Sequence, residues 1–185
     1  MRHKQHRGFT IIETLVAITI LTTSIVGPMY AIRNALVTSY TARDKLIATS
    51  LAQESIELIR QIRDNNYLYN LQHESSPKEW TEGLDALACY STNPVNTEFC
   101  VTDSTENAVA NQIQECDGAC GPLYISATNL YTQSNAVGAT PTTFYRTVQM
   151  YEARPDELRI LVTVTWKTNT VQYSITVTDV IYNWL

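Results

Sequence analysis

The stretch GFTIIETLVAITILTTSIVGPMYAI, residues 8–32, decides the fold of this 185-residue chain. Glu13 and Tyr30 carry the only ionisable side chains between residues 9 and 32, and Arg33 ends the apolar run. About 24 helical residues at about 1.5 Å each span roughly 36 Å, which is enough to cross the hydrocarbon core of a membrane. The sequence therefore predicts a membrane-spanning helix over residues 9–32.

A short basic segment, residues 1–8, precedes this run. Its basic side chains are Arg2, Lys4 and Arg7, and no acidic residue occurs before Glu13. By the positive-inside rule, these charges hold the N-terminus in the cytoplasm. An ordinary secretory signal places its small-residue cleavage site after an apolar stretch of about 7–15 residues. Because Gly8 stands before the apolar run, the segment is not an ordinary secretory signal.

Gly27 and Pro28 lie inside the apolar run. Proline removes an amide donor and clashes with the preceding helical turn, so a kink or local melting is expected near Val26. The helical pattern resumes beyond this point. Residues 33–64 are therefore expected to form the amphipathic second half of the same helix.

The amphipathic half carries an apolar stripe at helical period. Its members are Tyr40, Ile47, Leu51, Leu58 and Ile62. Charged side chains lie mostly away from this stripe, which favours packing within the chain over contact between chains. The helix is expected to end near Asp64, because Asn65 and Asn66 tolerate the left-handed conformation of a helix C-terminus.

Residues 65–120 are weakly patterned and predict an irregular loop, with a short helix near residues 108–114. The loop contains all four cysteines, Cys89, Cys100, Cys116 and Cys120. An even count in an exported domain favours disulfides, and a zinc site would need a second close Cys or His pair. Of the three possible pairings, loop length favours Cys89–Cys100 and Cys116–Cys120.

Residues 121–185 change to a period of two and predict an antiparallel β-sheet. The expected strands cover residues 123–125, 143–152, 158–166 and 173–185, and a polar turn at residues 167–170 makes a hairpin of the last two. One face of this sheet is expected to pack on the helix stripe, giving an α+β fold. Trp166 and Trp184 are expected to be core or sheet-face aromatics.

The hexapeptide Gly8-Phe9-Thr10-Ile11-Ile12-Glu13, with its basic leader and apolar run, resembles the cleavage-and-methylation signature of type IV prepilins and type II secretion pseudopilins. The run LAQESIELIR, residues 51–60, is similar to the Ala-x-Glu-x-x-Glu-like run of minor pilins and minor pseudopilins. The C-terminal stretches at residues 163–166 and 182–184 also look like that subgroup. The resemblance implies a type IV pilin-like fold, with a long N-terminal helix packed on a C-terminal antiparallel sheet.

The resemblance further implies that a prepilin peptidase cuts between Gly8 and Phe9 and N-methylates Phe9. A residue without a side chain at position 8 lets the backbone enter a narrow protease site. An ionised carboxylate in hydrocarbon costs several kcal/mol, so Glu13 is expected to pair with the new α-ammonium of Phe9, its own or a neighbour's. The simpler alternative is that Glu13 snorkels to the membrane interface.

The expected function is that of a structural filament subunit, a minor pilin or pseudopilin. Two alternatives stay open: a tip subunit for adhesion or DNA uptake, and an unprocessed single-pass membrane-anchored surface protein. The implied partners are other pilin or pseudopilin subunits, the prepilin peptidase, the inner-membrane assembly platform and membrane lipid. The chain would reside in the bacterial inner membrane before assembly and in an extracytoplasmic, cell-surface filament afterwards.

Composition argues against other classes of function. The formal net charge of -5 disfavours a nucleic-acid partner, which needs a basic stripe. An enzyme is not expected, because His73 is the only histidine beyond the leader and no catalytic set can be assembled around it. No cofactor is expected; Asp103, Glu106 and Asp117 offer a weak possibility of a Ca²⁺ loop without EF-hand spacing.

Overall fold

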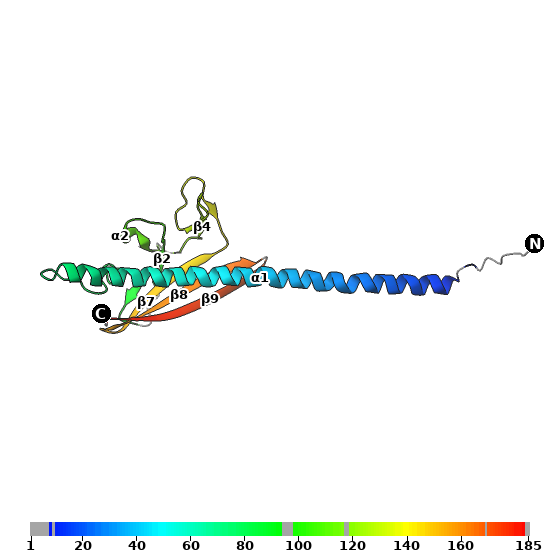
Figure 1. The fold of residues 1–185 in the computed structure, drawn as a ribbon, viewed down its shortest axis with the longest axis horizontal. Helices are drawn as coiled ribbons and strands as arrows, with labels where there is room; N and C mark the ends of the chain where they lie inside the picture. The colour runs from blue at the N-terminus through cyan, green and yellow to red at the C-terminus, as the bar shows by residue number, and fades with distance from the viewer. Residues whose placement is uncertain (1–7, 9, 94–97, 117–118, 169, 184–185) are drawn as a thin grey trace, which may run out of the picture. The chain divides into compact units, whose positions relative to one another are not determined.

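The computed structural model describes residues 8, 10–93, 98–116, 119–168 and 170–183. The chain divides into two compact units, Met1–Asp44 and Lys45–Leu185. One helix, α1 (Ile11–Gln72), belongs to both units, so each part of it is described with its own unit. Figure 1 shows its apolar N-terminal part in blue and the long β-strands of the second unit in yellow to red.

In the first unit, α1 has no covering layer, and every side chain from residue 10 to residue 40 is exposed. The helix continues through Gly27 and Pro28, so the local melting expected near Val26 is not seen. Hydroxyl groups along this part donate to carbonyls three or four residues earlier, over 2.8–3.0 Å. They belong to Thr14, Thr19, Thr22, Thr23 and Ser24. The helix therefore satisfies its own hydroxyl groups.

In the second unit, α1 runs past the expected stop to Gln72. Asn66 is buried, and its amide donates to the carbonyls of Trp80 at 3.3 Å and Glu82 at 2.9 Å. These hydrogen bonds hold the returning chain against the helix. The prediction of a helix end at Asn65-Asn66 is wrong, because Asn66 serves a tertiary contact and not a C-cap.

The helix buries one stripe against the sheet. Its buried apolar members are Ala48, Leu51, Ala52, Ile56, Leu58, Ile59 and Ile62. Ile47 packs against the core while partly exposed, whereas Tyr40 is 57% exposed and belongs to the first unit. The predicted stripe is therefore correct from Ile47 onward and wrong at Tyr40.

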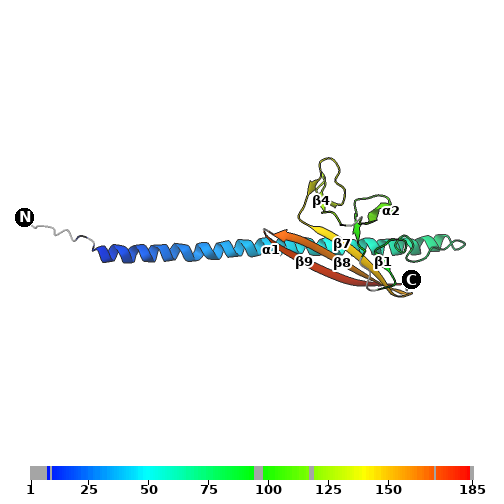
Figure 2. The ribbon, with the colours of Figure 1, turned by 180° about the vertical axis from the view of Figure 1, so that it is seen from behind.

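The main sheet has the order β3-β2-β7-β8-β9, and β1 pairs with β7 in parallel. Its long strands are β7 (Tyr145–Arg154), β8 (Glu157–Thr168) and β9 (Val171–Tyr182), all antiparallel. Figures 1 and 2 show this sheet lying along the part of α1 that belongs to the second unit. Alternate residues of β7 and β8 face the helix, and they include Val148, Met150, Leu158, Ile160, Val162, Val164 and Trp166. The α+β fold with a long N-terminal helix is confirmed.

The division into a loop and a sheet differs from the expectation. Three short strands from the expected loop join the main sheet: β1 (Tyr90–Ser91), β2 (Cys100–Thr102) and β3 (Ile113–Glu115). A short helix, α2 (Val109–Gln112), precedes β3. A separate small sheet, β5-β4-β6, is formed by β4 (Tyr124–Ile125), β5 (Tyr131–Thr132) and β6 (Thr140–Pro141). The expected sheet over residues 121–185 is thus two sheets, and one of them extends into the loop.

Candidate functional site

The start of α1 is fixed by Thr10, the residue before the first helical position. The Thr10 Oγ1 atom accepts a hydrogen bond from the Glu13 amide at 3.3 Å, and the Thr10 carbonyl accepts from Glu13 at 3.1 Å and Thr14 at 3.2 Å. Thr10 is therefore the N-cap, and Glu13 stands at the third helical position. The spacing Thr-x-x-Glu is that of a capping box, a sequence signal that predicts a helix start at this position.

Glu13 and Gly8 are both exposed. Glu13 lies in the first turn, where the positive end of the helix dipole favours a carboxylate. Gly8 has nothing within 4 Å of an added Cβ, so its own surroundings do not demand a glycine. The expected methylation site, Phe9, lies outside the described residues.

The helix that follows is long and apolar enough to cross a membrane, and none of its most apolar window is buried within the chain. Large side chains are exposed on all sides of it, for example Ile11 at 86% and Val26 at 64%. A soluble surface does not carry an apolar area of this extent without a partner. Lipid or neighbouring apolar helices are the environments that match it.

Comparison with protein families agrees with this geometry. Residues 3–27 match the family described as the prokaryotic N-terminal methylation motif. The chain carries the hallmark of type IV prepilin-like proteins. A comparison with curated proteins and with solved structures found no match. The type IV pilin-like family is structural and not enzymatic, and its motif implies assembly with other pilin subunits.

The folded unit of this prepilin-like chain contains a buried cation, Arg146, on the helix-facing side of β7. Arg146 is 0% exposed; its Nη1 donates to the Leu51 carbonyl at 3.0 Å, and its Nη2 to the Thr102 carbonyl at 2.6 Å. The carboxylate of Glu54 lies 3.4 Å from Nη1. Burial lowers the pKa of Arg146, and the carboxylates of Glu54 and Asp103 oppose that shift. Arg146 thus joins α1, β2 and β7 at one point.

The sequence analysis missed Arg146, although Glu54 lies in the run that resembles minor pilins. A readable signal exists, because Arg146 alternates with Val148 and Met150 on the inner face of a predicted strand. A cation at an inner position is costly unless it is paired. The carboxylate of Glu54 also accepts a hydrogen bond from the Ser104 hydroxyl, which extends the same network to the segment after β2.

Asp103 connects β2 with the small sheet. Its Oδ1 accepts from the amide and hydroxyl of Thr105, and its Oδ2 accepts from the Thr132 hydroxyl at 2.6 Å and the Gln133 amide at 2.7 Å. Burial alone would raise the pKa of Asp103, but these hydrogen bonds outweigh it and lower the pKa. Both carboxylate oxygens are therefore occupied by donors within the chain.

The possible Ca²⁺ loop gains no support from this arrangement. Among the described residues, no three or more His, Cys, Asp or Glu side chains gather in a way that could hold a metal ion. Asp117, the third residue named for that loop, lies outside the described part of the chain. The backbone carbonyl of Glu106 accepts a hydrogen bond from the side-chain amide of Gln112 at 3.0 Å.

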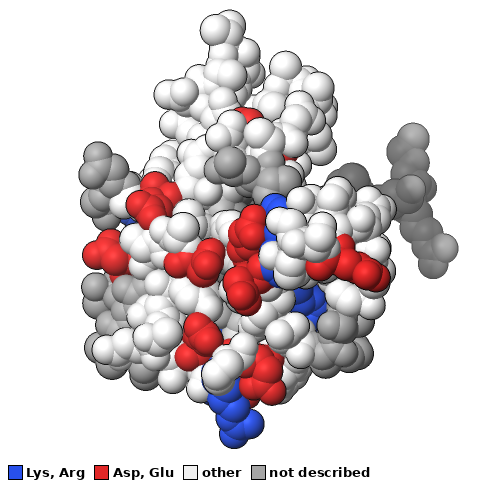
Figure 3. Space-filling view, turned by 90° about the vertical axis from the view of Figure 1, so that its left-hand side faces the viewer, with Lys and Arg blue, Asp and Glu red and all other residues white. Residues whose placement is uncertain are grey.

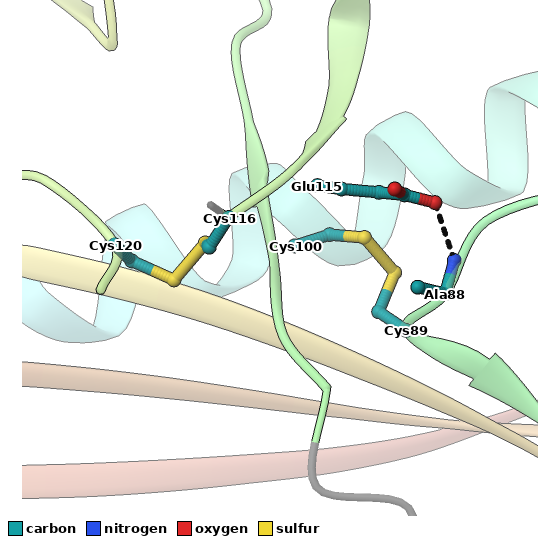
Figure 4. Close-up of a disulfide and its surroundings, with 6 residues drawn as sticks. All are labelled: Ala88, Cys89, Cys100, Glu115, Cys116 and Cys120. Carbon is teal, nitrogen blue, oxygen red and sulfur yellow. Dashed lines mark hydrogen bonds between the residues drawn. A yellow bond between two sulfur atoms is a disulfide. The ribbon is translucent and has the colours of Figure 1, made fainter. Parts of the chain in front are cut away.

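Two disulfides hold the segment between the helix and the long strands (Figure 4). They join Cys89 to Cys100 and Cys116 to Cys120, the pairing that loop length favoured. Cys89 and Cys100 are fully buried, and the Cys89 carbonyl accepts from the Met150 amide of β7 at 2.8 Å. Figure 4 also shows the Glu115 carboxylate accepting from the Ala88 amide, at 2.6 Å. The disulfides therefore fix the short strands to the edge of the main sheet.

The surface at the end where α1 finishes is acidic. Figure 3 looks onto this side, and carboxylates are more prominent than basic side chains there. The exposed residues of the 73–85 segment include Glu74, Glu79, Glu82 and Asp85, whereas Lys78 is its only Lys or Arg. A phosphate backbone would be repelled by such a surface.

Proposed function

We propose that this chain is a structural subunit of a type IV pilus-like or type II secretion-like filament, a minor pilin or pseudopilin. A prepilin peptidase cuts between Gly8 and Phe9 and methylates the new N-terminus of Phe9. The subunit waits in the inner membrane with its second unit outside the cytoplasm. An inner-membrane assembly platform then moves it into an extracytoplasmic filament.

The observation that carries the proposal is the exposed apolar helix that begins directly after the Gly8–Phe9 bond, with Glu13 in its first turn. The apolar side chains of this helix up to residue 40 are exposed, and no other element of the first unit covers them. Lipid covers them before assembly, and the apolar helices of neighbouring subunits cover them in a filament. Lipid and neighbouring helices both remove this apolar surface from water, and each buried Å² contributes roughly 25 cal/mol. Transfer from one environment to the other therefore changes the solvation free energy little.

Glu13 fixes the axial position of the subunit in the filament. A carboxylate surrounded by apolar helices costs several kcal/mol unless it is paired. Cleavage after Gly8 creates an α-ammonium four residues before Glu13, which is the missing positive charge. Pairing between the two groups, within a subunit or between neighbours, sets the register of one helix against the next.

The position of the disulfides supports a minor subunit. Major pilins of this family often close their C-terminus with a disulfide-bounded loop. Here both disulfides precede the long strands. The four cysteines reinforce the segment at residues 89–120 instead.

The test is the mass and N-terminal sequence of the full chain, isolated from its native membrane with and without the prepilin peptidase. The expected product begins at methylated Phe9 only when the peptidase is present. A Gly8→Leu variant should remain uncut. Gly121→Leu is the matched control, because Gly121 also has open space around it, and this variant should be processed normally. A chain that begins at Met1 in all samples would contradict the proposal and favour an unprocessed membrane anchor.

A further inference from the structure

The strand β9 is a long, unshared edge of the main sheet. Its 12 residues pair with β8 along their whole length, and no strand in the described part of the chain pairs with its other side. An extended strand of this length measures about 40 Å. The free backbone N–H and C=O groups of such an edge are a template for another strand.

The other sheet edges in this chain are blunted. On the opposite side of the main sheet lie β3, with three residues, and β1, with two, and the small sheet ends in β5 and β6, with two residues each. The strand β6 also contains Pro141, which cannot donate a hydrogen bond. Short strands and proline are the usual ways in which proteins protect an edge.

None of these protections occurs on β9. It contains no Lys, Arg or Pro, and its pairing with β8 runs through 12 consecutive partners without a shift. The register of β7 and β8, by contrast, shifts between Glu152 and Arg154. The only charged residue of β9, Asp179, is bonded at 2.6 Å to Arg60 of α1. The β9 edge is therefore long and regular, and its one charged residue is already paired within the chain.

The two faces of β9 differ in chemistry. Tyr173, Ile175 and Val177 pack against the core and remain only partly buried. The opposite face presents the hydroxyl groups of Ser174, Thr176 and Thr178, of which Thr176 bonds to Thr163 of β8 at 2.9 Å. A strand added beside β9, with apolar residues on the helix side, would finish the burial of the first three side chains.

We propose that β9 is the docking edge for a strand of a neighbouring, different prepilin-like subunit, which extends the sheet from one subunit into the next. This inference rests on the filament function proposed above. Backbone hydrogen bonds supply the attraction, and the alternation of apolar and hydroxyl side chains sets the register.

The direction of β9 argues against a second copy of this chain as the partner. Arg60 bonds Asp179, and Arg63 bonds the Tyr182 carbonyl at 3.5 Å, so α1 and β9 run in the same sense. Two copies can join their β9 edges only through a two-fold axis. Antiparallel pairing would then put the Lys45 ends of the two second units, from which each chain continues to its apolar segment, at opposite ends of the joined sheet. That arrangement disfavours two chains anchored in the same membrane. Parallel pairing would set the apolar row of one copy beside the hydroxyl row of the other.

The partner must therefore offer a long free strand on the opposite edge of its own sheet. In this chain that side consists of β3, β1 and the short parts of β7 that β1 and β2 leave unpaired, and none of these can cover the 12 residues of β9. A different subunit is needed, with the same membrane topology and an uncharged edge strand. The structure thus assigns this chain a place in a mixed assembly of subunits.

The test uses the full-length chain in its native membrane, with the assembly machinery present. A photoreactive amino acid replaces Thr178 on β9 in one variant and Ile18 in the membrane helix in another, and mass spectrometry sequences the cross-linked peptides. The expected Thr178 adduct is a strand of a different protein that has its own leader, Gly-Phe junction and Glu motif. An adduct supports the β9 proposal only when the sequence of its cross-linked peptide identifies such a protein.

Three results would overturn the β9 proposal and leave the filament function intact, provided that the Ile18 variant captures prepilin-like neighbours. They are a Thr178 adduct with a second copy of this chain, an adduct with a protein that lacks the motif, and no Thr178 adduct. Failure of both variants to capture a prepilin-like protein would contradict the filament function itself, and the β9 proposal with it.

A charge placed on the edge gives an independent measurement with a matched control. Ser174 of β9 and Thr165 of β8 are register partners, one strand apart. Lysine at the edge should prevent strand addition, so Ser174→Lys should lower the yield of the Thr178 adduct about tenfold. Thr165→Lys adds the same charge away from the edge and should keep the yield within about twofold. Equal yields in the two variants would show that β9 does not pair as a strand.

Discussion

The two parts of α1 have the same backbone geometry and opposite surroundings. Up to residue 40 every described side chain is exposed, whereas residues 48–62 supply the stripe that packs on the sheet. The second part has its apolar face covered within the chain, and the first part depends on lipid or on other subunits. One helix therefore joins a part that packs within the chain to a part whose apolar surface is left for lipid or other subunits.

Among the variants that test this comparison, Arg146→Ala should have the largest effect on stability. The substitution removes the buried guanidinium, leaves two carbonyl groups without their donor and takes away the cation beside Glu54. The free energy of unfolding of the second unit should fall by about 3–5 kcal/mol, as for other broken buried pairs. Denaturant unfolding followed by tryptophan fluorescence measures it, because Trp166 is buried in the same core.

Arg159→Ala is the control for that substitution. The Arg159 side chain is 51% exposed, and its buried partner Glu157 keeps a second cation, Arg154, at 3.9 Å, so the loss of Arg159 should change stability by only about 1 kcal/mol. Processing at Gly8 should be unchanged in both variants. A loss of stability in Arg146→Ala no larger than in Arg159→Ala would mean that the buried network is not what joins α1 to the sheet.

Leu51→Ala and Leu21→Ala test the contrast with one substitution in two surroundings. Leu51 is 2% exposed and Leu21 is 60% exposed, on the same helix. Leu51→Ala should destabilise the second unit by about 3 kcal/mol, through lost burial and a cavity. Leu21→Ala should leave the unfolding of that unit unchanged when the full chain is studied in detergent micelles. A similar loss in both would contradict the separation between the two parts.

The Cys89–Cys100 disulfide should have a somewhat smaller effect. Replacing both cysteines by alanine should lower the free energy of unfolding by about 2–3 kcal/mol, because the unfolded chain gains freedom. The measurement is again denaturant unfolding of the full chain. Replacing Cys116 and Cys120 opens a shorter loop and should cost less. The reverse order would show that loop entropy does not govern these disulfides.

Thr10→Ala should have the smallest effect, confined to the first unit. It removes the side-chain acceptor of the Glu13 amide and should weaken the first turn of α1 by about 1 kcal/mol. Amide exchange at Glu13 and Thr14, measured by NMR in micelles, should become faster. Thr10→Ser keeps the hydroxyl group and should restore slow exchange, and neither variant should alter the unfolding of the second unit.

Periodicity made the large elements predictable. The apolar helix, the hairpin of β8 and β9 and the strand β7 all follow from local patterns, and the disulfides follow from short loops. The helix end was not predictable in this way. Asn66 looks like a stop signal locally, yet two carbonyl groups from residues 80 and 82 decide its role.

The residues of the candidate site also differ in whether local sequence can locate them. Gly8, Phe9 and Glu13 form a contiguous signature, so the sequence alone locates them. Arg146 acquires its role from Leu51 and Thr102, which are far from it in the chain. The strands β1 to β3 are too short for a periodic signal, and they form because disulfides and long-range pairing hold them on the sheet.

Under the proposed function, in which the second unit lies outside the cytoplasm, the disulfides bear on how that unit crosses the membrane. Each one joins a cysteine to the next cysteine along the chain, with separations of 11 and 4 residues. A chain that is threaded across the membrane behind its anchor exposes its cysteines in numerical order. The first to emerge meets its correct partner before the other two arrive. The order of export is therefore sufficient to direct oxidation, and the domain can reach its native bonds without an exchange of partners.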